Sequence, residues 1–147
     1  MRNLKRNQLK NSITSNCNMK KIISQKIIDN LPNREIDIWI KEFLHADHGL
    51  SRELAIISIA SKLRENYSKY SQMLLNEMNN EVHFMGVRLG NKSAWTLAIA
   101  LIENLKTEDY IRIKQEFNRW GEEEKEGLLD WLKDFPDHRK ILEKSRE

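Results

Sequence analysis

Apolar residues recur at intervals of three and four positions along nearly all of the chain after residue 19. This spacing places them on one face of an α-helix, so it predicts a protein built of helices. Two stretches, 52–65 and 93–105, are apolar around more than half of the helix circumference, and we expect them to be buried on two sides at the centre of the fold. Narrower apolar stripes predict further helices over residues 22–28, 36–44, 68–84, 107–120 and 122–135.

Polar and turn residues divide these stretches. Serine, threonine and asparagine side chains accept backbone N–H groups at the start of a helix, whereas glycine and proline commonly follow its end. The glycine-containing stretch 85–92 is the clearest loop. We therefore expect helix starts at Asn33, Ser51, Ser93 and Thr107, and helix ends at Leu31-Pro32, Gly49, Gly121 and Pro136.

No stretch requires a β-strand, and the short connections favour antiparallel neighbours. The predicted fold is therefore all-α: a compact bundle of six to seven antiparallel helices that forms one domain over residues 19–137. Residues 138–147 are expected to be a short frayed helix or tail. The pattern Trp-apolar-Lys-acid-Phe occurs at both Trp39–Phe43 and Trp131–Phe135, so a short HEAT-like solenoid of helical hairpins is an alternative.

The amino-acid composition excludes several classes of protein. The 147 residues are 39% hydrophobic and 32% charged, as in an ordinary soluble domain. No apolar run reaches the length of about 18 residues that a transmembrane helix needs. The single Cys17 excludes an internal disulfide framework and a cysteine-based zinc cluster. We therefore predict a soluble, cytoplasmic protein.

The net charge of +3 is distributed unevenly. Residues 1–28 contain seven basic side chains and no acidic one, whereas the rest of the chain carries 18 basic and 22 acidic side chains. Residues 1–18 have too few apolar positions to build a core, so we expect a flexible basic tail. Three roles stay open for this region: a targeting segment, sequence upstream of a start at Met19, and attachment of residues 1–28 to nucleic acid or an anionic surface.

A cluster of histidines and carboxylates is the most suggestive pattern for a metal ion. His45, Asp47 and His48 fall within four residues, and histidines three apart share a face where a helix continues through them. His83 could contribute from a second segment, as could Glu77 and Glu81. The alternative without a metal ion is that His45 and His48 lie at the C-terminal end of a helix and are exposed to solvent. The candidate metal ligands are thus His45, Asp47, His48 and His83.

The other motifs disfavour catalysis. Cys17 lies in the predicted tail, and the chain contains no Gly-x-Ser-x-Gly. Residues 86–93 contain two glycines followed by Lys92 and Ser93, but their spacing departs from that of a phosphate-binding loop. No catalytic residue and no cofactor is therefore assigned, and the sequence favours a binding protein over an enzyme.

One family shares features with this region. Residues 84–92, Phe-Met-Gly-Val-Arg-Leu-Gly-Asn-Lys, resemble a Phe-x-x-Val-x-Arg-x-x-Gly-Lys signature of EboA-like proteins, with one extra residue before Lys92. Trp95-Thr96-Leu97 and Glu126-x-Leu128-Leu129 are similar to later parts of that family. The resemblance covers residues 84–137 at most. It implies a helical protein linked to metabolite traffic between compartments, and it transfers no catalytic residue.

Two functions from different classes follow from these observations. The first is a non-catalytic helical binding or adaptor module that engages a protein partner through a groove or face, accessory to metabolite traffic as the resemblance implies. The alternative is a metal-binding helical protein or metal-dependent enzyme that uses His45, Asp47, His48 and His83. The adaptor predicts an exposed apolar patch, whereas the metal site predicts convergence of the histidines.

Overall fold

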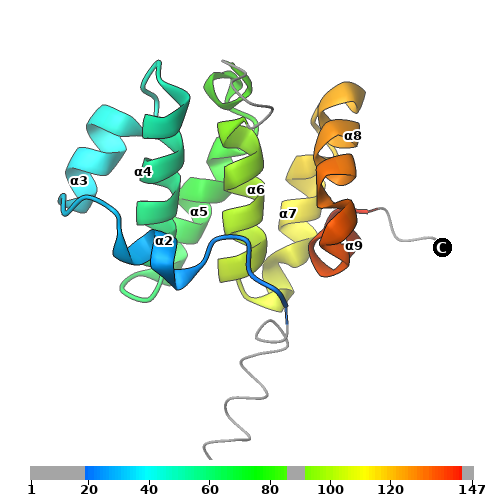
Figure 1. Ribbon diagram of the computed structural model, residues 1–147, viewed down its shortest axis with the longest axis horizontal. Coiled ribbons are helices and arrows are strands. Elements are labelled where there is room, and N and C mark those ends of the chain that lie inside the picture. Colours follow the sequence, from blue (N-terminus) through cyan, green and yellow to red (C-terminus); the bar gives the residue numbers. More distant parts are fainter. Residues whose placement is uncertain (1–18, 86–91, 144–147) are drawn as a thin grey trace, which may run out of the picture.

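All regular structure in the described part of the chain is helical, which confirms the all-α prediction (Figure 1). The computed structural model describes residues 19–85 and 92–143. Within these ranges eight α-helices are joined by short π and 3₁₀ turns. The elements are α2 (Gln25–Asp29), α3 (Ile36–Ile38), the π turn η1 (Trp39–Phe43), α4 (Gly49–Ser61), α5 (Tyr67–Glu77), the 3₁₀ turn η2 (Glu81–Phe84), α6 (Ser93–Asn104), the 3₁₀ turn η3 (Thr107–Asp109), α7 (Tyr110–Phe117), α8 (Glu122–Trp131), the 3₁₀ turn η4 (Leu132–Asp134) and α9 (Pro136–Leu142).

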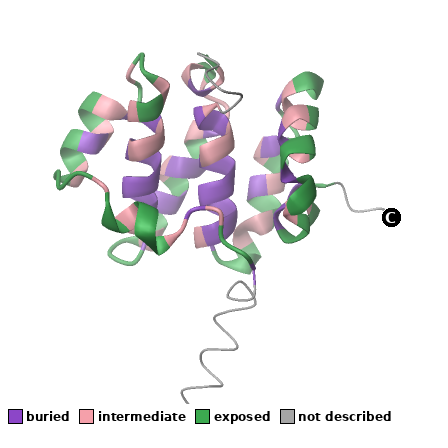
Figure 2. Ribbon diagram, in the orientation of Figure 1, coloured by how far each residue is buried: buried purple, intermediate pink, exposed green. Residues whose placement is uncertain are grey.

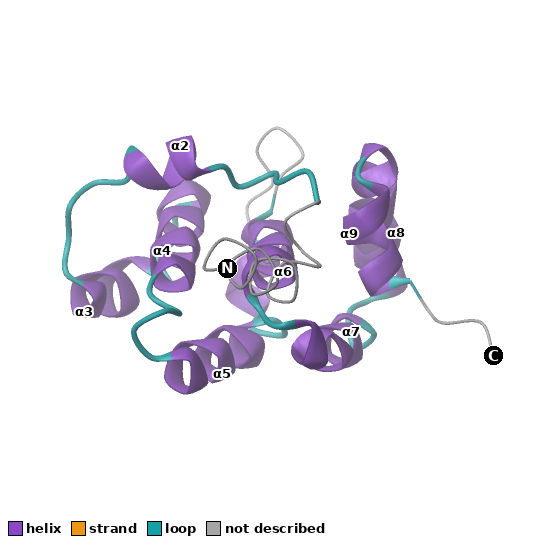
Figure 3. Ribbon diagram, turned by 90° about the horizontal axis from the view of Figure 1, so that it is seen from below, coloured by secondary structure: helices purple, strands orange, loops and turns teal. Residues whose placement is uncertain are grey.

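The helices α4 and α6 lie side by side at the centre of the molecule. Helices α5 and α7 cover one face of this pair, and the segment that contains α2 crosses the opposite face (Figure 3). α3 and η1 flank α4, while α9 packs against α6 and α7. A HEAT-like stack of hairpins stays a prediction. None of the described helices is long and apolar enough to cross a membrane.

The two central helices are also the most deeply buried ones (Figure 2). Seven of the 13 residues of α4 and nine of the 12 residues of α6 are buried. Each fully buried aliphatic side chain contributes about 1.5–3 kcal/mol relative to an exposed one, so this contact dominates the stability of the fold. The sequence-based expectation that these two stretches form the centre is therefore confirmed.

Several predicted helix boundaries are wrong. Gly49 and Gly121 were expected to end helices, but Gly49 is the first residue of α4 and Gly121 is the N-cap of α8. Glycine is also acceptable at the start of a helix, where its small size exposes the first N–H groups. Ser93 does not cap α6 but lies inside it, because its hydroxyl contacts side chains from other segments.

The ordered structure extends past the predicted domain end at residue 137. α9 begins at Pro136, where the missing N–H of proline leaves no hydrogen bond unmade. His138 and Leu142 in this helix are each 1% exposed. Residues 138–142 are therefore part of the packed fold, which corrects the expectation of a frayed end. The predicted tail 1–18 lies outside the described residues.

A buried carboxylate in α6 fastens both ends of the described chain. Glu103 is 3% exposed, and it accepts the backbone N–H groups of Ile22 and Ile23 at 2.7 and 3.0 Å. His138 Nε2 of α9 lies 2.5 Å from Glu103 Oε2. We call residues 19–29 the strap, because they cross α4 and α6 and end in α2. Glu103 thus joins the strap, α6 and α9 through a single side chain.

Tyr67 at the start of α5 provides a test of this packing at alkaline pH. Its hydroxyl donates to Asp109 Oδ2 at 2.5 Å and accepts the Lys106 N–H. Burial first, and then the hydrogen bond to Asp109, raises the pKa of Tyr67 well above its ordinary value of 10.0. The unfolded chain therefore loses this proton as the pH rises through about 10 while the folded chain keeps it, so stability falls with rising pH.

We expect urea unfolding midpoints to decline less steeply between pH 9 and 11 in Tyr67→Phe than in the original chain, because phenylalanine cannot ionise. Below pH 9 the Tyr67 hydroxyl is protonated in both the folded and the unfolded chain, so the unfolding midpoints of the two proteins should change with pH in the same way. Equal slopes in the alkaline range would contradict the assignment.

Candidate metal site

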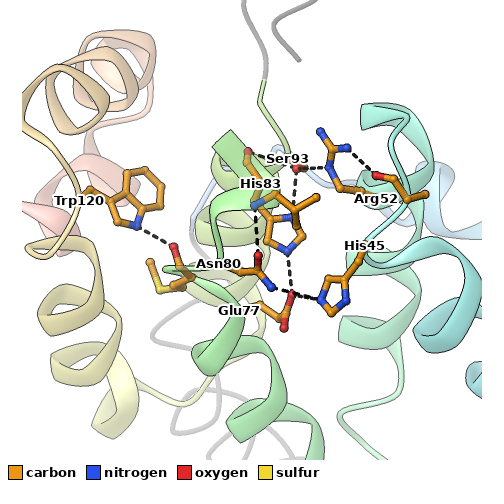
Figure 4. Close-up of polar contacts among 10 residues, drawn as sticks. His45, Arg52, Glu77, Asn80, His83, Ser93 and Trp120 are labelled. Atoms are coloured by element: carbon orange, nitrogen blue, oxygen red, sulfur yellow. Dashed lines mark hydrogen bonds and ion pairs between the residues drawn. The ribbon is translucent and has the colours of Figure 1, made fainter. Parts of the chain in front are cut away.

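Three side chains of types that can bind a metal ion, from separate segments, converge between α5, η2 and the turn after η1 (Figure 4). His45 Nε2 and His83 Nε2 lie 2.7 and 2.8 Å from the same oxygen, Glu77 Oε1. The three ligand atoms are all within 4.8 Å of one another. The cluster combines two imidazole nitrogens with one carboxylate oxygen, a set of ligand atoms typical of first-row transition-metal sites.

Local chain geometry brings each of these side chains into place. Glu77 is the last residue of α5. Asn80 then caps η2 by accepting the Val82 N–H, and this turn directs His83 back toward Glu77. His45 arrives from the opposite side, just after the π turn η1. The site is therefore assembled from the ends of elements, where the chain changes direction.

The cluster is buried on one side and open on the other. The side chain of His83 is 0% exposed and that of Glu77 is 14% exposed, whereas that of His45 is 53% exposed. Asn80 Nδ2 also lies 3.4 Å from His45 Nε2. Solvent and small ligands therefore reach the cluster from the His45 side, while His83 is fixed in the interior.

Ser93 supports the buried histidine from behind. Its Oγ lies 3.1 Å from His83 Nδ1 and 3.3 Å from the His83 carbonyl oxygen. If the single hydroxyl proton is donated to that carbonyl, Nδ1 of His83 must carry a proton and donate to Ser93. The lone pair of Nε2 then faces Glu77 Oε1. Two acceptors at this distance are stable only with a cation, either a proton or a metal ion, between them.

Arg52 of α4 holds the surrounding backbone together. The residue is 1% exposed, and its Nη1 and Nη2 donate to the carbonyls of Ala46 and Met85 at 2.6 and 2.8 Å. Its Nε donates to Ser93 Oγ at 3.0 Å. These three acceptors belong to the segments that carry His45, His83 and α6. One planar guanidinium therefore sets the relative positions of the histidines.

The charge state of Glu77 suits a ligand role. Burial acts to raise the pKa of the Glu77 carboxyl, but the hydrogen bonds from His83 and then from His45 outweigh it. The pKa of Glu77 consequently lies below its ordinary value, and the group is ionised at neutral pH. A carboxylate must be deprotonated to bind a metal ion, so no proton has to leave this ligand first.

A metal ion would require a small rearrangement of the three ligand atoms. Zinc binds nitrogen and oxygen at about 2.0–2.2 Å, so neighbouring ligand atoms of a tetrahedral site are roughly 3.3 Å apart. The two separations from Glu77 Oε1, 2.7 and 2.8 Å, would have to open by roughly 0.5 Å each, and the two histidine Nε2 atoms, which lie within 4.8 Å of each other, would have to adopt the same spacing. Three protein ligands leave at least one position for water, which is the arrangement of an open rather than a closed site.

The structure unites two of the four ligands named from the sequence. His45 and His83 belong to the cluster, and its third member is Glu77, which the sequence offered only as a further ligand. Asp47 and His48 are exposed and lie outside it. His48 is the N-cap of α4, whereas His45 precedes the turn before that helix, so the two histidines do not share a helical face.

Comparisons with known proteins gave no matching family model, no similar curated protein and no similar solved structure. The residues at the centre of the EboA resemblance, 86–91, lie outside the described residues. The function is therefore inferred from the geometry of the chain itself.

Proposed function

We propose that this protein binds a divalent transition-metal ion through His45, Glu77 and His83. The observation that carries the proposal is the convergence of two imidazole nitrogens and one carboxylate oxygen within 4.8 Å. Two imidazoles with one carboxylate suit Zn²⁺ and Fe²⁺, and the affinity of such nitrogen and oxygen sites generally rises from Mn²⁺ to Cu²⁺. This extends the metal-binding alternative drawn from the sequence, with Glu77 in place of Asp47 and His48.

The supporting residues favour this proposal over a simple hydrogen-bonded cluster. Histidines that bind metals usually donate their second nitrogen to a fixed acceptor, which orients the ring. Ser93 Oγ offers that acceptor to His83 Nδ1, and Arg52 holds the serine in place. An ion bound here would retain open positions toward the exposed His45, where a water molecule or a small ligand could coordinate. Such a site can act as a Lewis acid or activate water.

The test is a calorimetric titration of the metal-free protein with Zn²⁺, supported by the visible absorption spectrum of the Co²⁺ form. We expect one equivalent to bind, and His45→Ala to weaken binding by roughly a hundredfold, since one of three ligands is removed. His45 is exposed, so this variant should fold normally. Glu77→Gln, which keeps the size of the side chain, should weaken binding similarly.

His48→Ala is the matched control. This exposed histidine lies three residues further along the chain and outside the cluster, so its loss should leave the affinity unchanged. Failure of the original chain to bind Zn²⁺ or Co²⁺ saturably would overturn the proposal. Equal losses in His45→Ala and His48→Ala would do the same, because they would indicate unspecific binding to surface histidines.

A further inference from the structure

A cavity lies on the strap side of the central helices. It has a volume of about 250 Å³ and is lined by the strap, α4, α6 and the end of α8. Ile22, Ile23 and Ile27 of the strap form one wall, and Ile57 of α4 and Ile99 of α6 lie opposite them. None of the residues that line it belongs to the cluster of His45, Glu77 and His83. This cavity is therefore independent of the proposed metal site.

The size of the cavity fits a small organic molecule. An apolar cavity of about 150 Å³ is enough to hold benzene. A space of about 250 Å³ accommodates a ring with a short side chain. Ile27 and Trp131 at its border are 42% and 37% exposed, so the cavity communicates with solvent. A ligand can thus enter without any displacement of the core.

A carboxylate lines the cavity, and we call the part of the cavity beside it the acidic end. Among the described residues that line the cavity, Glu53 of α4 is the only ionisable one, and Glu53 Oε1 accepts the hydroxyl of Thr96 at 2.7 Å. Within the described ranges no lysine, arginine or histidine forms an ion pair with Glu53. A half-buried carboxylate beside an apolar space, with no ion-pair partner in the described part of the chain, attracts a cationic group of a ligand.

Aromatic rings flank the same space. Trp95 of α6 and Trp131 of α8 both line the cavity, with ring centroids 6.3 Å apart and planes inclined by 48°. The electron-rich face of an indole attracts organic cations, and tryptophan is the strongest of the aromatic side chains in this respect. Isoleucines, two indoles and a carboxylate together are complementary to a molecule with an apolar body and one positive charge.

We propose that this cavity binds a small hydrophobic ammonium compound, such as an arylalkyl amine. The ammonium group donates to Glu53 at the acidic end, and the apolar body fills the space between Ile57, Ile99 and the strap. The two tryptophans contact the cation or the adjacent ring. This activity is distinct from metal binding and does not depend on it.

The experiment is a titration with 2-phenylethylamine, followed by two-dimensional NMR of the isoleucine methyl groups and by tryptophan fluorescence. Two probes of nearly the same shape serve as comparisons: neutral 2-phenylethanol and anionic phenylacetate. We expect the amine to bind about tenfold more tightly than the alcohol at low salt, because only the amine forms a charge-assisted contact with Glu53. Phenylacetate should bind still more weakly. The largest shifts should occur at Ile57 and Ile99.

Glu53→Gln tests the acidic end directly. The glutamine oxygen still accepts the Thr96 hydroxyl, so the fold is preserved, but the preference for the amine over the alcohol should disappear. Glu123→Gln is the matched control, because Glu123 is exposed in α8 and lies outside the cavity, and it changes the net charge equally. This variant should keep the preference.

Three results would each overturn the proposal. They are absence of saturable amine binding, equal affinity for amine and alcohol in the original chain, and equal loss of the preference in Glu53→Gln and Glu123→Gln. Shifts confined to residues near His45 would also overturn it, because they would place the amine elsewhere.

Discussion

Glu103→Ala is expected to lower the free energy of unfolding by about 3–5 kcal/mol, as measured by urea denaturation followed by circular dichroism. The variant removes the acceptor for the Ile22 and Ile23 N–H groups and the partner of the buried His138. Each buried donor left without an acceptor costs about 1–3 kcal/mol. The strap should detach from α6 as a result, and the cavity beneath it should lose one wall.

Glu108→Ala is the control for this prediction, because Glu108 is exposed in the turn that follows α6. A surface change of this kind usually alters stability by less than about 0.5 kcal/mol. A double-mutant cycle of Glu103→Ala with His138→Ala should show a clearly non-additive loss, since the two side chains are in direct contact. Equal costs for the Glu103 and Glu108 variants would show that the buried carboxylate does not hold the strap.

Arg52→Met is expected to destabilise the protein by about 2–4 kcal/mol and to weaken Zn²⁺ binding by roughly 10- to 100-fold. Methionine fills much of the buried space but donates no hydrogen bond. The carbonyls of Ala46 and Met85 and the hydroxyl of Ser93 lose their shared donor, so the segments that carry His45 and His83 are no longer fixed to each other. The Zn²⁺ affinity is measured by calorimetric titration, and the free energy of unfolding is measured by urea denaturation.

Arg64→Met is the corresponding surface control, because Arg64 is exposed just after α4. It should leave both the affinity and the stability close to those of the original chain. If Arg52→Met folds and retains full affinity for Zn²⁺, the guanidinium does not position the ligands. Affinity is compared at a temperature where each variant remains folded, so that lost stability is not mistaken for lost binding.

The core of the fold could be predicted from the sequence, whereas helix ends were less predictable. Apolar residues around most of a helix leave no solvated face, so α4 and α6 had to be central. A potential capping residue does not fix the start of a helix, because its side chain can instead form a hydrogen bond with a residue that is distant in the sequence. Ser93 was expected to cap α6, but His83 and Arg52 use its hydroxyl, and Lys92 occupies the N-cap position instead.

The candidate site was only partly visible in the sequence. The proximity of His45 and His48 along the chain suggested a pair, but the chain turns between η1 and α4 and separates them. Glu77 and His83 do not have the spacing of a helical ligand pair, since they meet across a turn. Glu103 was overlooked, although a lone carboxylate within the apolar stretch 93–105 was the available signal for a buried polar contact.

The prediction of an adaptor with a protein partner and the resemblance to EboA-like proteins remain proposals. The cavity lined by the strap, α4 and α6 offers a chemical alternative to the adaptor, because the proposed occupant is a small molecule. Its ligand is defined by charge and size rather than by a helical partner.

The π turn η1 has a consequence for how this protein tolerates changes in length. In this turn the Leu44 N–H donates to the carbonyl of Trp39, five residues earlier, so one more residue is accommodated than in an α-helical turn. Each residue of an α-helix advances the side-chain direction by about 100°. Deleting one residue within Trp39–Phe43 would remove this extra residue and restore a regular α-helical turn, so the segment that follows, including His45, would keep nearly the same direction. The chain can therefore lose one residue in η1 and keep His45 beside Glu77, whereas the same loss within a regular α-helix would rotate the side chains beyond it.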